Sequence, residues 1–321
     1  MRLIRRGPFL AGAAGAVALA SRSASAQTLT PLRIACVPND DVTPLLYAQQ
    51  SGLFKRAGLD ITATPATSGA AIAAAVASGS YDIGLISMMG TITGRARGVP
   101  FVMIAPSLIY LTSDPSQQLI VLKDSPIKGA RDFAGKIVSC SAIRDVNWIS
   151  IRSWAYQQGV DSSTIKFVEL PMSAVPAARE QKRIDVGSLI DPSLAEAMAT
   201  GNFRSVGTPF DAIAKRWMIA AWSTTMDFVT KNRDVVDRFV NVMHAATLYV
   251  NAHHAETAPL FAAFAGLDPA RALAEKPVLL GDYLDPREIQ PAIDTAAKYG
   301  VIDKSFPAQD MISPYAPKAS R

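Results

Sequence analysis

Cysteine and histidine are scarce in this sequence, and their scarcity excludes several classes of catalyst. The 321 residues contain two cysteines and three histidines, which are His244, His253 and His254. Neither cysteine has a histidine nearby in the sequence, and the histidines lack Cys, Asp or Glu at the spacing of a metal site. We therefore expect no catalytic residue, no metal site and no cofactor, and we predict that the protein is not an enzyme.

Fingerprints of nucleotide and acyl chemistry are also missing. The sequence contains no P-loop, no glycine-rich dinucleotide fingerprint and no G-x-S-x-G elbow. After the N-terminal region, no apolar run reaches the roughly 20 residues that a membrane helix needs. These absences leave the binding of a small ligand as the favoured class of function.

The first 26 residues have the composition of a secretory signal peptide. Three arginines lie among the first six residues, residues 9–20 are apolar, and an Ala-Ser-Ala run at 24–26 supplies small residues at the cleavage position. The apolar run is shorter than the roughly 20 residues of a membrane span. We expect export to the periplasm by the Sec route, with the twin-arginine route as an alternative because of Arg5-Arg6.

Removal of that segment takes away four arginines and no acidic residue. The formal net charge, which is +5 for the whole chain, then falls to +1. A protein that binds nucleic acid presents a surplus of Lys and Arg as a basic patch. The remaining chain has no such surplus, so we expect no nucleic-acid partner.

Short apolar strands alternate with longer helical stretches through most of the remaining chain. This alternation is typical of α/β folds with largely parallel sheets. Thr43-Pro44 marks a helix start, because a capping residue precedes a proline suited to the first turn. The expected strands lie at 32–37, 60–63, 81–86, 101–104, 137–140, 166–170 and 185–190. The expected helices lie at 43–52, 70–77, 91–97, 174–181 and 193–199, with one more around Trp148 and Trp154.

Beyond Trp217 the sequence indicates mostly helix, at 233–251, 255–264, 271–280 and 286–299. We predict that the chain folds into two α/β lobes. Residues 27–119 form the first part of lobe 1, residues 120–217 form lobe 2, and residues 218–321 return to lobe 1. The crossings between lobes are expected near Gln118 and Trp217.

The two cysteines end expected core strands in different lobes. A bridge between Cys36 and Cys140 would lock the lobes together. Two buried free thiols are therefore favoured over a disulfide, although an oxidising compartment would permit one.

Several short runs resemble one known family when they are taken in order. They are YAQQSGLF at 47–54, AGLDI at 57–61, SG at 68–69, SGSYDIG at 78–84, DFAGK at 132–136 and YVNAHHAET at 249–257. This order is similar to that of the SsuA/THI5-like (NMT1-type) periplasmic solute-binding proteins of ABC importers. The resemblance implies a two-lobed type II periplasmic binding fold, a monomer, and a permease in the inner membrane as partner.

Two other functions remain open within this resemblance. Pyrimidine synthases that resemble these receptors act on their own residues in the cytosol, but they carry a cysteine-rich motif that this chain lacks. A ligand-binding module of a sensory system would share both the fold and the export signal. The absent motif and the export segment favour the transport receptor over the synthase.

In such folds a ligand binds where strand carboxyl ends and helix N-termini meet in the crevice between sheets. The free N–H groups and partial positive charge of helix N-termini hold ligand oxygens there. Applied to the expected elements, this rule selects as ligand-binding candidates Asn39, Asp40, Asp41, Thr43, Ser68, Gly69, Ser87, Met88, Ser141, Arg144, Asn147, Trp148, Ser173, Asp191 and Trp222.

Many of these candidates also have a purely structural interpretation. Thr43, Ser68 and Ser173 fit helix caps. The pair Asp40-Asp41 fits a solvated turn, and Trp148 fits core packing. The carboxylate of Asp191 would favour the start of the following helix.

The carboxylates among the candidates constrain the ligand. A sulfonate or nitrate would pair with Arg144, but the aspartates would repel it. Carboxylates together with the rings of Trp148 and Trp222 suit a flat heterocycle or an amine-bearing aromatic molecule. We predict capture of a small polar, heterocyclic or aromatic molecule similar to a pyrimidine precursor. A receptor for sulfonate, taurine or nitrate is the alternative.

Overall fold

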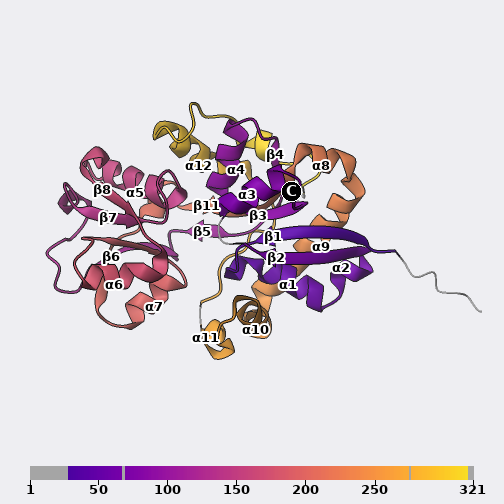
Figure 1. Cartoon of the computed structure of the whole chain (residues 1–321), viewed down its shortest axis with the longest axis horizontal. Coiled ribbons are helices and arrows are strands. Elements are labelled where there is room, and N and C mark those ends of the chain that lie inside the picture. Colours follow the sequence, from indigo (N-terminus) through magenta and orange to yellow (C-terminus); the bar gives the residue numbers. More distant parts are fainter. Residues whose placement is uncertain (1–27, 67–68, 275, 317–321) are drawn as a thin grey trace, which may run out of the picture.

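The computed structural model describes residues 28–66, 69–274 and 276–316, so the expected signal peptide and Ser68 lie outside the described residues. These residues form two α/β lobes that lie side by side, with a narrow pair of strands between them (Figure 1). We call the lobe with the N-terminal strand lobe 1 and the other lobe 2. The two-lobed α/β architecture predicted from the sequence is therefore confirmed.

Lobe 1 is built on a five-stranded sheet with strand order β2-β1-β3-β12-β4. Its strands are β1 (Thr30–Cys36), β2 (Leu59–Pro65), β3 (Ile83–Ser87), β4 (Phe101–Pro106) and β12 (Ala220–Thr225). β1 pairs in parallel with β2 and β3, whereas β12 runs antiparallel to β3 and β4. The carboxyl ends of the parallel strands therefore share one edge of the sheet.

β12 is a strand that the sequence analysis missed, because mostly helix was expected beyond Trp217. Five of its six residues are buried. The run Ala-Ala-Trp-Ser-Thr-Thr therefore has no alternation of apolar and polar residues that would mark a strand. β12 inserts between β3 and β4 after the chain returns from lobe 2, and the returning chain is thereby fixed to the interior of the lobe 1 sheet.

Lobe 2 contains two sets of strands. An antiparallel set in the order β10-β6-β9 comprises β6 (Gln117–Leu122), β9 (Gly187–Ile190) and β10 (Phe203–Gly207). A parallel pair comprises β7 (Ile137–Cys140) and β8 (Lys166–Glu169). A parallel bridge between Val138 and Val186 joins the two sets.

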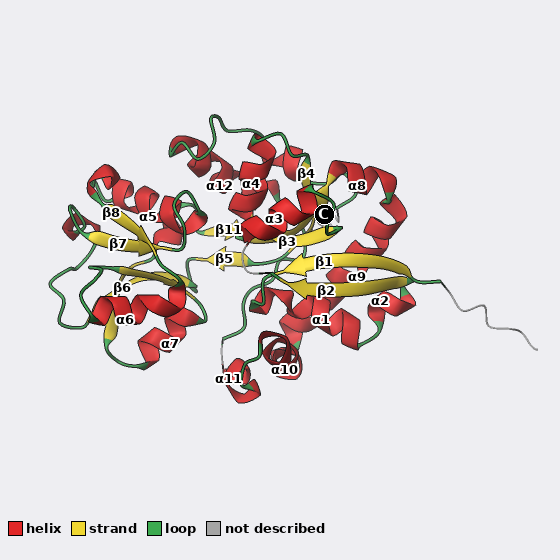
Figure 2. Ribbon diagram, viewed as in Figure 1, coloured by secondary structure: helices red, strands yellow, loops and turns green. Residues whose placement is uncertain are grey.

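The lobes are connected through a two-stranded antiparallel ribbon of β5 (Ile109–Leu111) and β11 (Arg216–Met218) (Figure 2). Trp217, near which a crossing was expected, lies in β11. Gln118, the other expected crossing point, pairs with Leu189 inside lobe 2. The first crossing therefore precedes residue 118.

Three buried aromatic rings pack at this ribbon. Phe210 lies in a 3-10 turn (Pro209–Ala212) that packs against the lobe 2 helix α5 (Val146–Gln157). Its ring centroid lies 5.4 Å from that of Tyr110 and 5.1 Å from that of Trp217, both in edge-on geometry. All three side chains are fully buried. The ribbon is therefore a packed joint rather than a bare linker.

Helices cover both lobes (Figure 2). In lobe 1 they are α1 (Thr43–Gln50), α2 (Leu53–Arg56), α3 (Gly69–Ala77), α4 (Met88–Ala96), α8 (Met226–Lys231), α9 (Arg233–Ala252), α10 (His254–Ala265), α11 (Pro269–Ala274) and α12 (Pro286–Lys298). In lobe 2 they are α5, α6 (Val175–Glu180) and α7 (Ser193–Ala199). The main apolar core of lobe 1 joins β1, β3, α1 and α9.

The helix expected at 271–280 is wrong in its second half. α11 ends at Ala274, and residues 276–279 are not helical. Pro277 explains the break, because proline has no N–H to donate and disfavours helix in the residue before it. Instead, the N–H of Ile109 donates to the carbonyl of Leu279 at 2.9 Å.

Both thiols are buried and free, as the sequence analysis favoured. Cys36 lies in lobe 1 and Cys140 in lobe 2, and each donates to a carbonyl oxygen of the neighbouring strand in its own lobe. Burial raises the pKa of each thiol to about 12. Neither cysteine is therefore a thiolate nucleophile at neutral pH.

The close approach of α3 to β3 generates a prediction about Gly84. A Cβ at Gly84 would lie 2.5 Å from Cγ2 of Ile72 and 2.9 Å from Cγ2 of Val76. We expect Gly84→Ala to lower the free energy of unfolding by about 1–3 kcal/mol, the usual cost of overpacking. Urea denaturation measures this loss.

Gly129→Ala is the matched control, because a Cβ there would meet no atom within 4 Å. A Gly84→Ala protein as stable as the control would show that α3 does not pack rigidly on β3.

Candidate functional site

Two helix N-termini meet at the edge of the lobe 1 sheet. Ser87 caps α4, and its Oγ accepts a hydrogen bond from the N–H of Gly90 at 3.2 Å. A Cβ at Gly69, the first residue of α3, would lie 3.2 Å from the same Oγ. The structure thus brings Gly69 and Ser87 together, and helix N-termini attract ligand oxygens.

Met88, the neighbouring candidate, does not offer its side chain to that edge. Its side chain is 1% exposed and belongs to an apolar cluster with residues of α12. Its N–H donates to the carbonyl of Ile219 at 2.7 Å. Met88 therefore supports the start of α4 from the core side.

The turn after β1 holds a buried carboxylate. Thr43 donates its hydroxyl to the carbonyl of Asp40 at 2.6 Å and to Oδ1 of Asp40 at 3.0 Å, which fixes the turn before α1. Asp41 is 4% exposed, and the hydroxyl of Ser107 donates to its Oδ2 at 3.4 Å. Oδ1 of Asp41 has no partner among the described residues. Asn39 is exposed.

Burial changes the acidity of Asp41. Loss of hydration, followed by the charge of Asp40, raises the pKa of Asp41 to about 7, and the hydrogen bond from Ser107 opposes this rise. At neutral pH both forms of Asp41 are therefore populated. The protonated form can donate a hydrogen bond, and the carboxylate form accepts one. A solvated turn, the structural alternative for Asp40-Asp41, does not describe Asp41.

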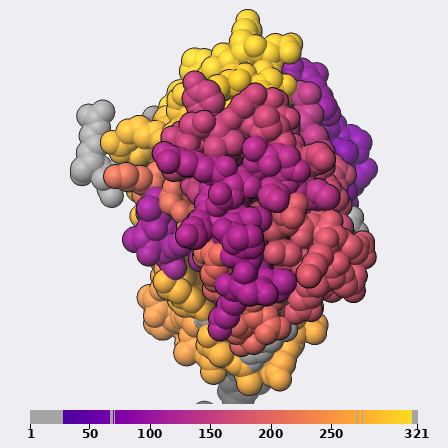
Figure 3. Space-filling view, turned by 90° about the vertical axis from the view of Figure 1, so that its left-hand side faces the viewer, coloured from indigo at the N-terminus to yellow at the C-terminus, as the bar shows by residue number. Residues whose placement is uncertain are grey.

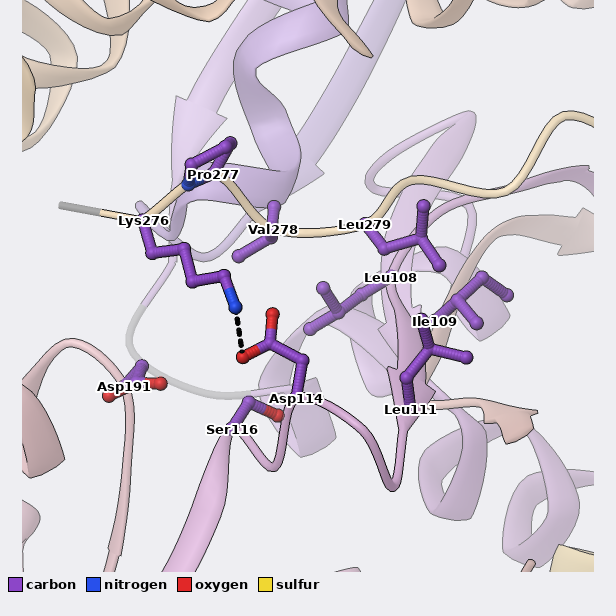
Figure 4. Close-up of a pocket in the computed structure, with 10 residues that line it drawn as sticks. All are labelled: Leu108, Ile109, Leu111, Asp114, Ser116, Asp191, Lys276, Pro277, Val278 and Leu279. Atoms are coloured by element: carbon purple, nitrogen blue, oxygen red, sulfur yellow. Dashed lines mark ion pairs between the residues drawn. The ribbon is translucent and has the colours of Figure 1, made fainter. Parts of the chain in front are cut away.

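A small cavity lies against the joint, close to Asp191 (Figure 4). Its volume is about 50 Å³. Nζ of Lys276 pairs with Oδ1 of Asp114 at 2.5 Å. Asp191 lies on the loop after β9, and this ion pair lies between Asp191 and the side chain of Leu108 (Figure 4). The cavity is lined by Leu108, Ile109, Leu111, Asp114, Ser116, Asp191 and residues 276–279.

A second, smaller cavity shares Pro277 and Val278 with the first. Asp40, Thr43 and His254 line it, and its volume is about 10 Å³, enough for roughly one water molecule. His254 therefore lies beside Asp40 and Thr43, two of the predicted ligand-binding candidates. No local pattern marked it, because the start of α10 reaches the turn after β1 only through tertiary packing.

In lobe 2 an aspartate missed by the sequence analysis organises the predicted loop. Asp145 caps α5, and its Oδ1 accepts from the N–H of Trp148 at 2.8 Å. Its Oδ2 accepts from the N–H of Ala142 at 3.1 Å and from the hydroxyl of Ser141. Burial raises the pKa of Asp145, and these hydrogen bonds oppose the rise. The hydroxyl of Ser141 thus stabilises the Asp145 side chain that caps α5.

Asn147, in the first turn of α5, is fully buried, and neither atom of its side-chain amide has a hydrogen-bond partner among the described residues. A buried amide without partners is costly in free energy. Of the predicted candidates, Asn147 is the one whose side-chain donor and acceptor atoms are both buried and unpaired among the described residues.

Other lobe 2 candidates are engaged elsewhere or exposed. Trp148 is half-buried, with the guanidinium of Arg152 4.6 Å from its ring centroid and Phe167 packed edge-on. Arg144 donates to carbonyl oxygens of lobe 1. Ser173 is exposed in a short 3-10 turn.

Trp222 was expected to face the crevice, and the structure places it elsewhere. Its side chain is 1% exposed in the lobe 1 core, and its ring meets Phe239 of α9 edge-on at 6.0 Å. The reason is the missed strand. Trp222 lies within β12, and its side chain points to the face of the sheet covered by α9.

Two further observations concern the described residues as a whole. Within 28–66, 69–274 and 276–316, no three His, Cys, Asp or Glu side chains are grouped so that they could hold a metal ion. In the same part of the chain, no helix combines the length and apolar character of a membrane span.

The fold is shared with solved periplasmic binding proteins. The periplasmic aliphatic sulphonate binding protein SsuA from Escherichia coli is 18% identical, with a TM-score of 0.74, over 91% of this chain and 94% of that chain. The periplasmic nitrate-binding protein NrtA from Synechocystis PCC 6803 is 13% identical, with a TM-score of 0.70, over 89% of this chain and 86% of that chain. At these identities the likeness shows the fold.

Curated relatives carry a different name. The 4-amino-5-hydroxymethyl-2-methylpyrimidine phosphate synthase of Schizosaccharomyces pombe is 24% identical over 217 residues, which are 64% of this chain and 60% of the relative. The synthase of that name from Legionella pneumophila is 28% identical over 135 residues, 42% of this chain and 41% of the relative. The match thus spans about 60% or less of the length of these relatives.

These names correct one prediction. The sequence analysis predicted that the protein is not an enzyme, and relatives named as a synthase contradict that prediction. The scarcity of cysteine and histidine on which the prediction rested excludes particular catalytic groups, not catalysis by this fold.

The family itself is decided by a match that covers more than half of the chain. The family model described as NMT1/THI5 like matches residues 39–257, from the turn after β1 to the first turns of α10. The resemblance read from the sequence is confirmed, and the chain belongs to the NMT1/THI5-like family.

Proposed function

We propose that this protein is the periplasmic solute-binding component of an ABC importer, which captures a small heterocyclic or aromatic molecule between its two lobes. The carboxyl ends of β1 and β3 in lobe 1 and the start of α5 in lobe 2 supply the polar groups of the site. In α/β folds, ligands bind at such edges, where helix N-termini and strand ends converge.

Asn147 is the observation that carries the proposal. A side-chain amide offers one acceptor oxygen and two N–H donors, and in Asn147 both ends are unpaired and fully buried. A ring that carries a donor beside an acceptor, such as an aminopyrimidine, satisfies both ends. A sulfonate or nitrate has only acceptor oxygens and leaves the amide oxygen unpaired.

The acidic groups favour the same class of ligand. Asp41 lies at the lobe 1 edge, and Asp114 and Asp191 line the cavity at the joint. Anionic ligands meet repulsion from carboxylates at such an edge. Asp41 in its protonated form donates a hydrogen bond to a ring nitrogen, and in its ionised form it accepts one from an amino group.

Closure of the lobes about the β5–β11 joint would couple binding to transport. A ligand that contacts both lobes stabilises the closed form, because only that form satisfies donors and acceptors from each side. The permease in the inner membrane then receives the closed, monomeric protein. Export by the N-terminal segment places the protein in the periplasm, where such a permease is reached.

A second candidate function is pyrimidine synthesis, which the names of the curated relatives favour. The resemblance implies that such synthases act on their own residues. Against this, the two cysteines of the chain are buried and lie in different lobes, so they form no cysteine-rich motif.

The ligand class is tested by thermal denaturation of the purified protein with a panel of compounds. We expect aminopyrimidines or aromatic amines to raise the melting temperature, because a ligand at about 100 times its Kd adds about 2.7 kcal/mol to stability. Taurine, alkanesulfonates and nitrate should leave it unchanged. Stabilisation by these anions alone would refute the proposed ligand class.

Replacement of the buried amide separates a ligand contact from a structural one. Asn147→Leu should leave the ligand-free protein as stable as the original or more so, because an apolar side chain of similar size has no unpaired polar atoms. The same variant should lose the stabilisation by ligand. Ser173→Ala, a change at an exposed candidate, should keep it. Retained ligand stabilisation in Asn147→Leu would exclude the amide as a contact.

Asp41 generates a prediction about pH. Its pKa in the folded protein, about 7, exceeds the ordinary value of 3.8. Folding therefore favours the protonated form, and this group lowers stability progressively as pH rises from about 4 to about 7. Asp41→Asn should have the same free energy of unfolding as the original protein near pH 4. At pH 8 its free energy of unfolding should be higher by a few kcal/mol, because each pKa unit corresponds to about 1.4 kcal/mol. Urea denaturation at both pH values measures the difference, and an equal difference at both would contradict the assignment.

The synthase candidate is tested by the intact mass of the protein. If the protein is a binding component, protein purified from cells should have the mass of its processed sequence, and native mass spectrometry should show an added small molecule. A chain that has lost mass from one of its own side chains would instead favour the synthase.

A further inference from the structure

The loop that leads into α5 reaches across to lobe 1. Nη2 of Arg144 donates to the carbonyl oxygen of Gly300 at 2.6 Å and to that of Val301 at 3.0 Å. These carbonyls directly follow α12, which packs in lobe 1 against α4 and β11. A single guanidinium nitrogen therefore joins the two lobes. The C-terminal end of a helix carries partial negative charge, which attracts a cation such as the guanidinium.

Side chains of α5 and α12 extend this contact. The guanidinium of Arg152 lies 4.6 Å from the ring centroid of Trp148 in its own helix and 5.4 Å from that of Tyr299 in lobe 1. Nζ of Lys298 lies 4.2 Å from the ring centroid of Tyr156. Seen from the end of lobe 2, the yellow C-terminal part of the chain borders the lobe 2 surface (Figure 3).

The backbone of Arg144 has a conformation that its own residue type disfavours. Its φ is 70°, in the left-handed region, and among the described residues other than glycine only Lys182 shares a positive φ. Such a conformation persists where the surroundings impose it. Here the surroundings are the docked guanidinium on one side and, on the other, Asp145, which caps α5.

We propose that Arg144 is a closure latch. It docks on the end of α12 when the lobes are together, and it is released when they move apart about the β5–β11 joint. The guanidinium that was expected to bind a ligand anion is a positioning group, which holds the first turn of α5 next to lobe 1. The inference rests on the proposed function in one respect, namely that ligand binding closes the lobes.

The latch has a consequence for affinity. A ligand that binds the closed form has an apparent Kd equal to its intrinsic Kd divided by the closed fraction. Contacts that hold the lobes together without ligand therefore raise affinity without touching the ligand. This separates the role of Arg144 from that of Asn147.

Single-molecule fluorescence transfer on ligand-free protein tests the latch. Dyes on Lys166→Cys in β8 and Lys231→Cys at the end of α8 report the distance between lobes, and both positions are exposed while the native thiols are buried. Arg144→Ala should raise the open-to-closed ratio about tenfold or more, as expected for lost hydrogen bonds to a charged group. Arg144→Lys keeps the charge but loses the planar donors, so its open-to-closed ratio should lie between those of the original protein and Arg144→Ala.

Two glycine variants separate the contact from the backbone strain. Arg144→Gly relieves the left-handed strain yet removes the guanidinium, and it should open the lobes as Arg144→Ala does. Lys182→Gly relieves the same strain in the loop after α6, where the N–H of Lys182 donates to the carbonyl of Arg179 within lobe 2, and it should leave the ratio unchanged. Circular dichroism verifies that each variant is folded.

Unchanged ratios in both Arg144→Ala and Arg144→Gly would overturn the latch. Because the measurement uses ligand-free protein, this outcome is independent of the ligand panel. If no expected compound in the ligand panel stabilises the protein but the Arg144 variants open the lobes, the latch is supported and the ligand class is refuted. If an expected compound stabilises the protein but the Arg144 variants leave the ratio unchanged, the ligand class is supported and the latch is refuted.

Discussion

The aromatic packing at the β5–β11 joint is the constraint on which the rest of the structure depends. Phe210, from the lobe 2 side, packs edge-on against Tyr110 and Trp217 of the ribbon. The phenol of Tyr110 also donates to Oδ1 of Asp211 at 2.7 Å. Close-packed rings resist sliding because each displacement loses contacts on all sides. The packed rings thereby resist displacement of the two lobes at the ribbon.

The proposed site draws its polar groups from distant parts of the chain. Asp41 follows β1, Asn147 begins α5, and Asp191 follows β9, yet each lies at a strand end or helix start of its own lobe. Asp41 and Asn147 have buried side-chain atoms without a partner among the described residues, and such atoms are costly unless a ligand meets them. A family with this geometry can include both binding proteins and a synthase, because the fold supplies the crevice and individual side chains supply the chemistry.

Local patterns predicted much of the fold because their physics is local. Thr43-Pro44 and Asp285-Pro286 begin helices at or beside the positions expected, since proline suits a first turn. Ser87 and Gly69 were predicted as site residues from strand-then-helix order, and the structure places them together at one edge of the lobe 1 sheet. Asp145 was missed, although a capping residue before an apolar run is a readable pattern. His254 had no such pattern, because only packing brings α10 to the turn after β1.

The sequence by itself determined the α/β class, the family and the strand ends at which the candidate residues lie, because hydrophobic periodicity and helix caps depend on neighbours in the chain. Tertiary structure decided that Trp222 is core, that residues 276–279 leave the helix and Leu279 bonds to Ile109 at the joint, and that Arg144 donates to carbonyl oxygens of lobe 1. These outcomes depend on contacts between residues far apart in the chain, for example 157 positions for Arg144 with Val301. Burial and partner choice at that separation are properties of the packed molecule, and no local pattern encodes them.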